Sequence, residues 1–385
     1  MKIRLHEPTF GEEEINSAVE VLRSTQVTQG EKVKEFERSI CNTMNYEKAV
    51  ACNSGSSANL LAISALKALG RLKDGDEVIV PALSWSTTVF PIIQHGLIPV
   101  FVDCGLDTLN MQQPEITDKV KAVMPVHVYG NPCRINVDRN VLLIEDCCEA
   151  MYAGINYEAM ANTYYHDFVG THCDVATFST YFSHHITTLE GGVVVTRDAE
   201  IDDMLRIQRS HGWTRDVKWN IDSGLDPKFT FVELGYNLRM TEVQAAIGII
   251  QLRKLEGIVN RRRKAHKTLT ESLSHISWLR LQKEIGGGRS SCFGFTMITE
   301  DSSPFSANVI RYHLEEHGIE TRPIICGNMA RQPVMKKYKH RCIGDLKNAT
   351  KVMNDGFSIG CHQDITENDI DHILHVFDKL RKKAA

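Results

Sequence analysis

Short apolar segments alternate with helical patterns through the first half of the chain. The segments that are apolar enough to be strands buried on both faces are 48–52, 77–82, 100–103, 122–128, 141–146, 175–179 and 192–196. Several of them are separated by apolar residues at helical spacing, as in the stretch 59–69. Parallel strands need a crossover connection, and a helix is the usual one. The alternation therefore predicts an α/β fold built on a largely parallel sheet.

The remaining patterns indicate a second, smaller domain. The 385 residues exceed the size of one typical core. A long helical pattern over 241–275 separates the range 1–240 from mixed strand and helix signals over 276–385. We therefore expect a large α/β domain, a linking helix and a small α+β domain in these three ranges. Near the start, Thr9 to Glu12 fits a capping box in front of a first amphipathic helix.

Composition narrows the class of protein. Apolar residues make up 42% of the chain, and no run approaches the roughly 18 consecutive apolar residues of a transmembrane helix. The segment 1–8 lacks the apolar core of a signal peptide. A net charge of −4 and a pI near 6.5 disfavour a protein that coats nucleic acid. These features predict a cytoplasmic protein that binds neither membrane nor nucleic acid.

Two further features have ordinary interpretations. The basic run 261–264 is expected to be a solvated helix face, the alternative being a contact with a phosphorylated ligand. The 11 cysteines include no Cys-x-x-Cys pair and show no regular spacing, which favours reduced thiols over a disulfide framework. Neither feature indicates a metal site, and none is predicted.

A turn of small polar residues, 53–59, lies between a predicted strand and a predicted helix. Free backbone N–H groups at a helix start, together with hydroxyls such as that of Ser56, can hold a phosphate. Such a turn is also an ordinary connection between two elements. It lacks the Gly-x-Gly-x-x-Gly spacing of a dinucleotide-binding fold and the Lys-Ser/Thr ending of a P-loop. Hydride transfer and nucleotide hydrolysis are therefore disfavoured.

Two more positions have both a structural and a functional interpretation. Asp146 ends an apolar strand, where a carboxylate can serve a turn or can pair with the nitrogen of a pyridine ring. Trp85 follows another strand, and its indole can belong to the core or stack on an aromatic cofactor. Neither position decides between its two interpretations by itself.

The segment 178–192, FSTYFSHHITTLEGG, completes an ordered set of motifs. With the polar turn, Trp85 and Asp146, it resembles the sugar aminotransferases, a family of fold type I pyridoxal-phosphate enzymes that modify nucleotide-linked 4-keto-6-deoxy sugars. The resemblance covers essentially the whole chain. In that family a lysine stands two positions before the Ile-Thr-Thr part of the motif, and this chain has His184 there. The adjacent His185 is expected to hydrogen-bond the loop or to point away.

The resemblance implies an aspartate-aminotransferase-like fold with a pyridoxal 5′-phosphate site. The residues carried over to the cofactor phosphate are Gly55, Ser56 and Ser179. Trp85 is expected to stack on the ring, Asp146 to pair with its nitrogen and Glu149 to lie beside its hydroxyl. Asn237 is expected to reach the phosphate of a neighbouring chain, which implies a homodimer with shared active sites.

Three basic residues are weaker candidates for the anionic groups of substrate or co-substrate: His211, Arg215 and Arg322. An arginine suits carboxylate and phosphate groups because it can bind them through two parallel hydrogen bonds. A structural salt bridge is the alternative for each of them.

Histidine in place of lysine changes the chemistry that the site can support. A lysine amine can form an imine with the cofactor aldehyde, whereas an imidazole cannot but transfers protons well near neutral pH. The resemblance implies that family members with histidine at this position are 3-dehydratases. It also implies that this chain removes the C3 hydroxyl of GDP-4-keto-6-deoxy-D-mannose with His184 as the base. It also implies that L-glutamate restores pyridoxamine 5′-phosphate and that ammonia is released.

Other activities remain open from the sequence alone. A related group acts on CDP-linked sugars with an iron–sulfur cluster, but this chain has no Cys-x-Cys and no cysteine between Cys173 and Cys292, so no cluster is predicted. A 4-aminotransferase with a displaced lysine is disfavoured because no lysine lies between Lys121 and Lys218. A catalytically inactive cofactor-binding regulator is the non-enzymatic alternative.

Overall fold

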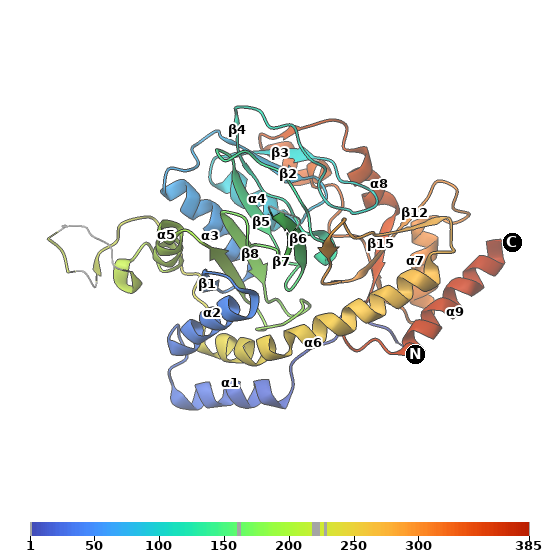
Figure 1. The fold of residues 1–385 in the computed structure, drawn as a ribbon, viewed down its shortest axis with the longest axis horizontal. Coiled ribbons are helices and arrows are strands. Elements are labelled where there is room, and N and C mark those ends of the chain that lie inside the picture. Colours follow the sequence, from blue (N-terminus) through green and yellow to red (C-terminus); the bar gives the residue numbers. More distant parts are fainter. Residues whose placement is uncertain (1, 160–162, 218–223, 227–228, 385) are drawn as a thin grey trace.

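A mostly parallel sheet forms the centre of the molecule (Figure 1), whose computed structural model describes residues 2–159, 163–217, 224–226 and 229–384. The sheet has eight strands in the order β1-β9-β8-β5-β4-β2-β3-β14. They are β1 (Lys48–Cys52), β2 (Glu77–Pro81), β3 (Ile98–Val102), β4 (Val120–Val123), β5 (Leu142–Asp146), β8 (Val175–Ser179), β9 (Gly192–Thr196) and β14 (Arg341–Cys342). All neighbours from β8 to β14 are parallel, while β9 runs antiparallel to β8 and β1. The predicted α/β fold is confirmed.

Helices cover both faces of this sheet. One layer holds α3 (Gly55–Ala68), α4 (Ser86–Gln94) and α5 (Ala199–Arg209), and the other holds α1 (Glu12–Ser24), α2 (Glu31–Met44) and α6 (Glu242–Leu273). Alternate residues of a strand point to opposite faces. Val50 and Cys52 of β1 accordingly pack in the core with α3, whereas Ala49 and Ala51 pack in the core with α2. The strands β2, β8 and β9 are buried at every position, which is why their sequences are largely apolar.

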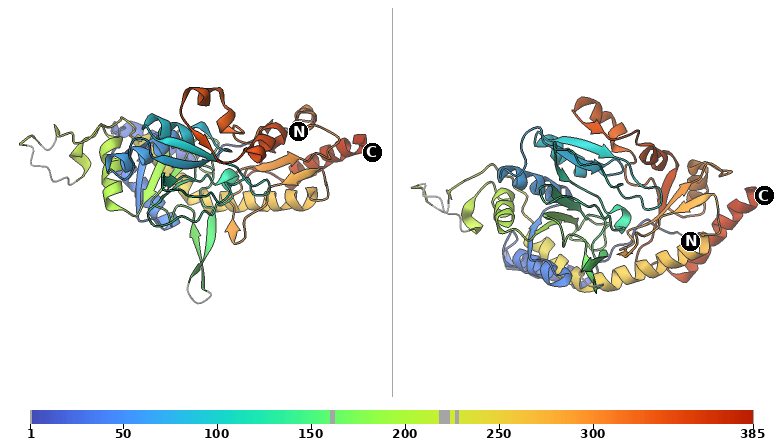
Figure 2. Two further views of the ribbon diagram at one scale, coloured as in Figure 1. Left: turned by 90° about the horizontal axis from the view of Figure 1, so that it is seen from above. Right: turned by 45° about the horizontal axis from the view of Figure 1, so that its top comes forward.

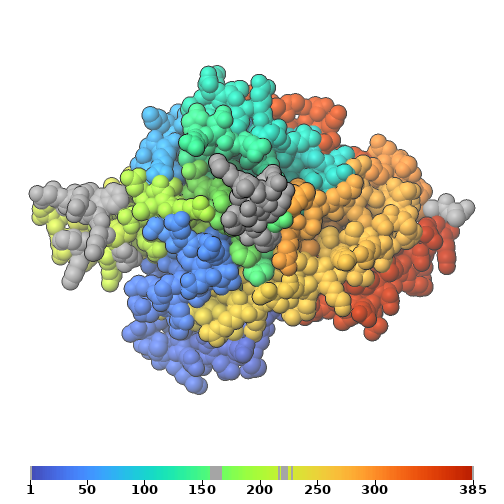
Figure 3. Space-filling model, viewed as in Figure 1, coloured from blue at the N-terminus to red at the C-terminus, as the bar shows by residue number. Residues whose placement is uncertain are grey.

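The C-terminal part of the chain builds a second, antiparallel sheet. Its strands, in the order β10-β12-β15-β13, are β10 (Leu279–Leu281), β12 (Phe295–Thr299), β15 (Gly356–Ile359) and β13 (Thr321–Arg322). The helices α7 (Ala307–Glu316), α8 (Lys347–Asp355) and α9 (Glu367–Ala384) accompany it. The 32-residue helix α6 runs from beside α1 and α2 to α9, as the yellow stripe in Figure 3 shows. Because β14 joins the edge of the main sheet, the C-terminal range is tied to the large sheet as well; the three predicted domain ranges stay a prediction.

A third, small sheet was not anticipated from the sequence. It pairs β6 (Gly154–Ala159) with β7 (Thr163–Phe168) in a hairpin that projects from the body of the molecule (Figure 2) and adds β11 (Gly288–Arg289) to it. Short 3-10 turns complete the described structure: η1 (Val128–Gly130), η2 (Thr214–Asp216), η4 (Met329–Arg331) and η5 (Pro333–Lys337).

Most local signals agree with the structure, but the predicted cap of the first helix does not. The strands β1, β8 and β9 begin and end at the predicted residues, and α7 starts after the cap Ser306 and is followed by Gly318 at φ +82°. The predicted capping role of Thr9 is wrong. Gly11 caps α1, and its N–H donates to Glu14 at 2.8 Å, whereas the Thr9 hydroxyl bonds a side chain of α6. A long-range partner thus replaces the local one.

Two findings concern the expected class of protein. Among the helices in the described ranges, none combines the length and the apolar character needed to cross a bilayer. All 11 cysteines are free thiols, as expected from their irregular spacing.

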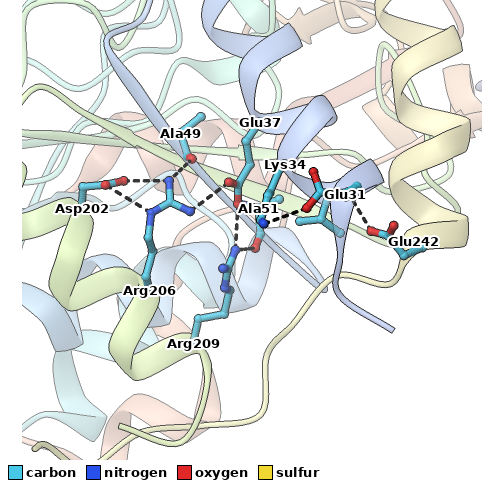
Figure 4. A network of polar contacts seen from close by, with 10 residues as sticks. Glu31, Lys34, Glu37, Ala49, Ala51, Asp202, Arg206, Arg209 and Glu242 are labelled. Atoms are coloured by element: carbon cyan, nitrogen blue, oxygen red, sulfur yellow. Dashed lines mark hydrogen bonds and ion pairs between the residues drawn. The ribbon is translucent and has the colours of Figure 1, made fainter. Parts of the chain in front are cut away.

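A buried ionic cluster joins α2 to α5 behind β1 (Figure 4). Glu37 of α2 is 6% exposed and accepts hydrogen bonds from Arg206 at 2.9 Å and from Arg209 and the Ala51 N–H at 2.8 and 2.9 Å. Burial alone would raise the pKa of the Glu37 carboxyl, but the two guanidiniums outweigh it and hold that pKa below its ordinary value. Glu242 serves the same helix, because it accepts from the N–H groups at the start of α2.

Replacing Glu37 tests how much this cluster stabilises the fold. We expect Glu37→Gln to lower the free energy of unfolding by about 3 kcal/mol at pH 7, because two guanidiniums lose their buried counter-charge. Since the folded-state pKa is lowered, the carboxylate contributes fully above pH 4.5 and loses its effect as the pH falls through the lowered value. Urea unfolding of the wild type and the variant at several pH values would therefore show a difference in stability that becomes smaller as the pH falls below 4.5.

The control for this prediction is Glu35→Gln. Glu35 lies on the same helix, but its ion pair with Lys32 is exposed to solvent. Such pairs contribute less than about 1 kcal/mol. Equal destabilisation by the two variants would contradict the role assigned to Glu37.

Candidate active site

A cavity of about 470 Å³ lies at the carboxyl ends of β5 and β8 and at the start of α3 and α4. The carboxyl edge of parallel strands is where α/β folds usually bind ligands. The cavity brings together most of the residues predicted from the sequence, namely Gly55, Ser56, Trp85, Asp146, Glu149, Ser179, His184 and Arg322. Thr88, Cys148, Tyr181, Glu190, Phe293 and Ile325 also line it.

The polar turn before α3 is shaped as a cradle for an anion. Ser54 caps the helix, and its hydroxyl accepts from the Ser57 N–H at 3.1 Å, which leaves the Gly55 and Ser56 end of the helix open to the cavity. Gly55 is required there because a Cβ would lie 2.5 Å from Cβ of Ser179. Gly192 is required for the same reason, since its Cβ would lie 2.2 Å from the Ser54 carbonyl oxygen.

Asp146, the last residue of β5, is held by three donors. Its Oδ2 accepts from Asn59 Nδ2 at 2.9 Å and from the Thr88 hydroxyl at 2.8 Å, and its Oδ1 accepts from the Cys148 N–H at 3.1 Å. Asn59 is in turn oriented by the Thr177 hydroxyl at 2.5 Å. The carboxylate is 4% exposed and faces the cavity in one fixed orientation. This arrangement suits a buried acceptor for a pyridine N–H.

The loop between β8 and β9 presents His184 to the cavity. The Thr180 N–H donates to the Gly191 carbonyl at 2.9 Å, and the Thr180 and Thr188 hydroxyls lie 2.6 Å apart, so the loop is closed across its base. His184 Nδ1 lies 3.3 Å from the Ser179 carbonyl. Because a carbonyl only accepts, Nδ1 carries the proton and Nε2 keeps its lone pair.

The surroundings of His184 favour its neutral form. Burial lowers the pKa of His184 to about 4, and the positive charges of Arg262 and Arg322 act in the same direction. The ring of Phe293 packs edge-on against the imidazole, with centroids 5.2 Å apart. At neutral pH this histidine is therefore an unprotonated group that can accept a proton.

His185 turns away from the cavity, in agreement with the expectation for it. Its ring is 1% exposed, and Nε2 donates to the Ser291 carbonyl at 3.0 Å. Burial holds the pKa of His185 well below its ordinary value. The residue thus anchors the loop to the segment that precedes β12.

Glu149 and Arg322 form a second polar side of the cavity. Glu149 Oε2 accepts from the Tyr129 N–H at 2.9 Å. Burial raises the pKa of Glu149 to about 7, although the charge of Arg322 opposes the change. Among the described residues, Arg322 makes no ion pair, so its guanidinium is available to an anionic ligand at the cavity.

These residues fit pyridoxal phosphate. The glycine cradle with Ser56 and Ser179 matches the phosphate, since a Cβ at Gly55 would fill that space. Asp146 matches the ring nitrogen. Trp85, which is 52% exposed beside the cavity, offers an uncovered indole to the ring.

Comparison with known proteins agrees with this arrangement. The model of the DegT/DnrJ/EryC1/StrS aminotransferase family matches residues 8–378. The chain belongs to this family. GDP-4-keto-6-deoxy-D-mannose 3-dehydratase of Yersinia pseudotuberculosis is 38% identical over 395 residues, with 97% of each chain covered.

Two solved structures of proteins with this enzyme name are similar to the chain over nearly its full length. The Escherichia coli GDP-4-keto-6-deoxy-D-mannose 3-dehydratase with bound hydrated PLP is 36% identical, with a TM-score of 0.89 and coverage of 98% of this chain and 99% of that one. A structure of GDP-4-keto-6-deoxymannose 3-dehydratase with a trapped PLP–glutamate geminal diamine has the same identity and TM-score, with coverage of 97% and 100%.

In this chain, three of the predicted site residues lie outside the cavity. His211 and Arg215 line a separate hollow of about 470 Å³ with Gly30, Lys34 and Arg239. The Arg215 guanidinium lies over the Trp213 ring at 5.2 Å. Asn237 is exposed and pairs with Ser210 through a β-bridge. Within one chain, these residues are not brought to His184.

Several residues of the site were missed by the sequence interpretation. Asn59 could have been found, because it lies four residues after Gly55 and therefore on the same side of the helix. Phe293 had no local signal, since it comes from the C-terminal range and reaches His184 only in the folded chain. The interpretation of the basic run 261–264 as a solvated face is wrong for Arg262, which is 1% exposed because carbonyl groups from distant segments surround it. Arg261 and Lys264 are exposed.

The described residues contain one group whose side chains could ligate a metal, formed by His127, Glu145 and Cys147. Its atoms are engaged in hydrogen bonds. His127 Nδ1 accepts from the Cys133 N–H at 2.8 Å, and Nε2 donates to Glu145 at 3.2 Å. The group serves to fix the strand end behind Asp146.

Gly55→Ala tests the cradle. The added Cβ must push the start of α3 away from β8, which we expect to cost about 2 kcal/mol of stability. We also expect it to weaken pyridoxal phosphate binding by at least about tenfold, because the helix end and Ser179 are displaced together. Thermal unfolding and an absorbance titration with the cofactor measure the two effects.

The control is Gly286→Ala, since no atom lies within 4 Å of the Cβ position of Gly286. Equal cofactor affinity in the two variants would contradict the phosphate-binding role assigned to the turn before α3.

Glu149→Gln tests the buried carboxyl. Because the pKa of Glu149 is raised from 4.5 to about 7, ionisation destabilises the cofactor-free protein progressively as the pH rises through this window. The variant is therefore expected to be more stable than the wild type above pH 7, by up to about 3 kcal/mol, and equally stable near pH 4. Urea unfolding at several pH values measures this difference. Glu20→Gln, on the exposed side of α1, should show none, and a pH-independent effect of Glu149→Gln would refute the assignment.

Proposed function

We propose that this chain is a pyridoxal/pyridoxamine 5′-phosphate-dependent 3-dehydratase that converts GDP-4-keto-6-deoxy-D-mannose to GDP-4-keto-3,6-dideoxy-D-mannose. The observation that carries the proposal is the position of His184, whose imidazole lines the cavity where the family has a lysine and has Nδ1 3.3 Å from the Ser179 carbonyl. The relatives that bear this enzyme name match over nearly the full chain, which supports the choice of substrate.

The residues that would hold the cofactor follow from the geometry. Gly55, Ser56 and Ser179 would bind the phosphate, and Asp146 would accept the hydrogen bond of the ring nitrogen. Trp85 would cover one face of the ring, and Glu149 would lie beside the ring hydroxyl. When bound, the amine form of the cofactor supplies a primary amine for the C4 ketone and a ring that withdraws electrons from it.

His184 supplies the proton transfer. Its Nε2 would take the proton from the carbon that bears the cofactor's amine, and the electron pair of that C–H bond would allow the C3 hydroxyl to leave. Nδ1–H on the Ser179 carbonyl keeps the ring in this tautomer. Once protonated, the imidazolium can donate to the C3 hydroxyl oxygen of the sugar, which leaves as water. The low pKa of His184 makes it a ready donor in this second role. No other described lysine or histidine lines the cavity.

The overall reaction needs a second substrate to restore the amine. L-Glutamate would do so and leave as 2-oxoglutarate, and the sugar intermediate would release ammonia. Substrate plus glutamate then gives the 3-deoxy sugar, 2-oxoglutarate and ammonia, with all atoms accounted for. The structure of a similar dehydratase that holds a PLP–glutamate adduct supports glutamate. Arg322, which lines the cavity, would receive one of the glutamate carboxylates.

A homodimer with shared sites is part of the proposal. Asn237, His211 and Arg215 lie on a surface apart from the cavity of their own chain. A second copy would use them to close the cavity over phosphate and substrate anions. The expected location in the cytoplasm stays a prediction.

A direct assay tests the reaction. Purified protein would be incubated with pyridoxal phosphate, L-glutamate and GDP-4-keto-6-deoxy-D-mannose, and ammonia, 2-oxoglutarate and the sugar product would be measured. We expect equal amounts of all three, with a product lighter by one oxygen. A 4-amino sugar as the main product would identify a 4-aminotransferase instead, and binding of cofactor without turnover of GDP-, CDP- or dTDP-linked sugars would identify a regulator.

Substitution of His184 tests the base. We expect His184→Asn to bind the cofactor normally but to lose at least about 100-fold in the rate of dehydration, since proton transfer by a positioned side chain contributes that much. His184→Lys should lose C3 deoxygenation as well and gain a link to the cofactor that borohydride reduces. The exposed His275 provides the control His275→Asn. Dehydration at the wild-type rate in His184→Asn would show that another group is the base.

A further inference from the structure

The guanidinium of Arg262 is buried without a carboxylate partner. Nη1 donates to the carbonyl oxygens of Phe293 at 3.0 Å and Cys361 at 3.5 Å, and Nη2 donates to Gln363 Oε1 at 3.3 Å. Nε has no partner, and within the described ranges the side chain forms no ion pair. An isolated buried cation is costly, and an apolar side chain of similar size would avoid that cost. The cost of burying this charge suggests that Arg262 has a function that an apolar side chain could not perform.

Arg262 remains charged in this environment. Burial lowers the pKa of Arg262 to about 10, which still leaves the guanidinium protonated at neutral pH. Its neighbours on α6 differ from it: Arg261 is exposed, and Arg263 is half-buried and donates to the Ser290 carbonyl at 2.7 Å. A fixed positive charge is thus placed inside the protein at one position of the run.

The segment that Arg262 binds is also the segment that holds the two histidines. The residues 291–293 form a sharp turn with Cys292 at φ +55°, an unfavourable conformation for a residue with a side chain. The Ser291 carbonyl accepts from His185, and the Phe293 ring packs against His184. Arg262 contacts this turn through the Phe293 carbonyl. Loss of that contact would loosen the turn that contacts both imidazoles.

The charge of Arg262 also acts on the histidines. Burial is the first cause of the lowered pKa of His184 and of His185, and Arg262 adds to it in both. The charge of Arg322 also lowers the pKa of His184, whereas the charge of Asp146 raises it. The other titratable groups that line the cavity are Cys148, Glu149, Tyr181 and Glu190.

We propose that Arg262 is a positioning residue for His184: it holds the turn 291–293 against both histidines and keeps a fixed positive charge close to them. The inference rests on the proposed function, because it takes His184 to be the base. Arg262 is not among the residues that line the cavity, so it would act on His184 through Phe293 and through its electric field.

Histidine titration in the cofactor-free full-length chain tests this proposal without any turnover. The Cε1–H signals of labelled histidines would be followed by NMR against pH, with His184→Asn used to assign the signal of His184. Removing the charge in Arg262→Met should raise the titration midpoint of His184 by about one pH unit, as expected for a charge at moderate distance in the protein interior. Arg261→Met, the matched control, should leave it unchanged. The same midpoint in both variants would overturn the proposal.

Arg262→Lys separates position from charge and covers the case that Arg262→Met does not fold. A lysine keeps the charge but cannot hold the same fork of acceptors. We expect an unchanged midpoint for His184, together with a kcat about tenfold lower, since small displacements of a base are costly. Wild-type kcat in Arg262→Lys would overturn the positioning role. The two failures are distinguishable, because absence of the 3-deoxy product in the direct assay would refute the proposed function, whereas the NMR midpoints test Arg262 alone.

Discussion

The antiparallel pairing of β8 with β9 is the constraint on which the active site depends. It sets Ser179 opposite Gly192 and so fixes both ends of the loop that carries His184. The same pairing brings Gly192 against the Ser54 carbonyl, where only a residue without Cβ fits. The distance between the phosphate cradle and the base is therefore decided by backbone contacts. Such contacts cannot adjust as a flexible side chain can, which is how a site is pre-organised.

Burial and nearby fixed charges then set the protonation states of His184 and Glu149. The pKa of His184 is lowered and that of Glu149 is raised, mainly by burial in both cases, so each is shifted towards its neutral form. Three hydrogen-bond donors hold the Asp146 side chain in place. The cavity thus combines a carboxyl side chain that three donors hold in place with an imidazole that has a free lone pair. This combination suits proton transfer next to an electron-withdrawing ring.

The parts of the fold that were predictable are those with local causes. The strands β1, β8 and β9 are apolar throughout because both of their faces are buried, and their bounds were predicted to the residue. The long helix α6 follows from its periodic apolar residues. The burial of Arg262 was not predictable, because a run of four basic residues looks solvated unless the carbonyl groups that receive it are known. The separation of His211 and Arg215 from the cavity of their own chain was likewise not visible from the sequence around them.

The sequence by itself determined the chemistry that is present: the order of the motifs, the small residues of the cradle, and a histidine where the family has a lysine. Only the tertiary structure decided how that histidine behaves. Its tautomer depends on the Ser179 carbonyl, and its charge state depends on Phe293, Arg262 and Arg322, which come from three distant segments. Contacts between distant segments leave no periodic or local signal in the chain, so their effect appears only when the core has packed.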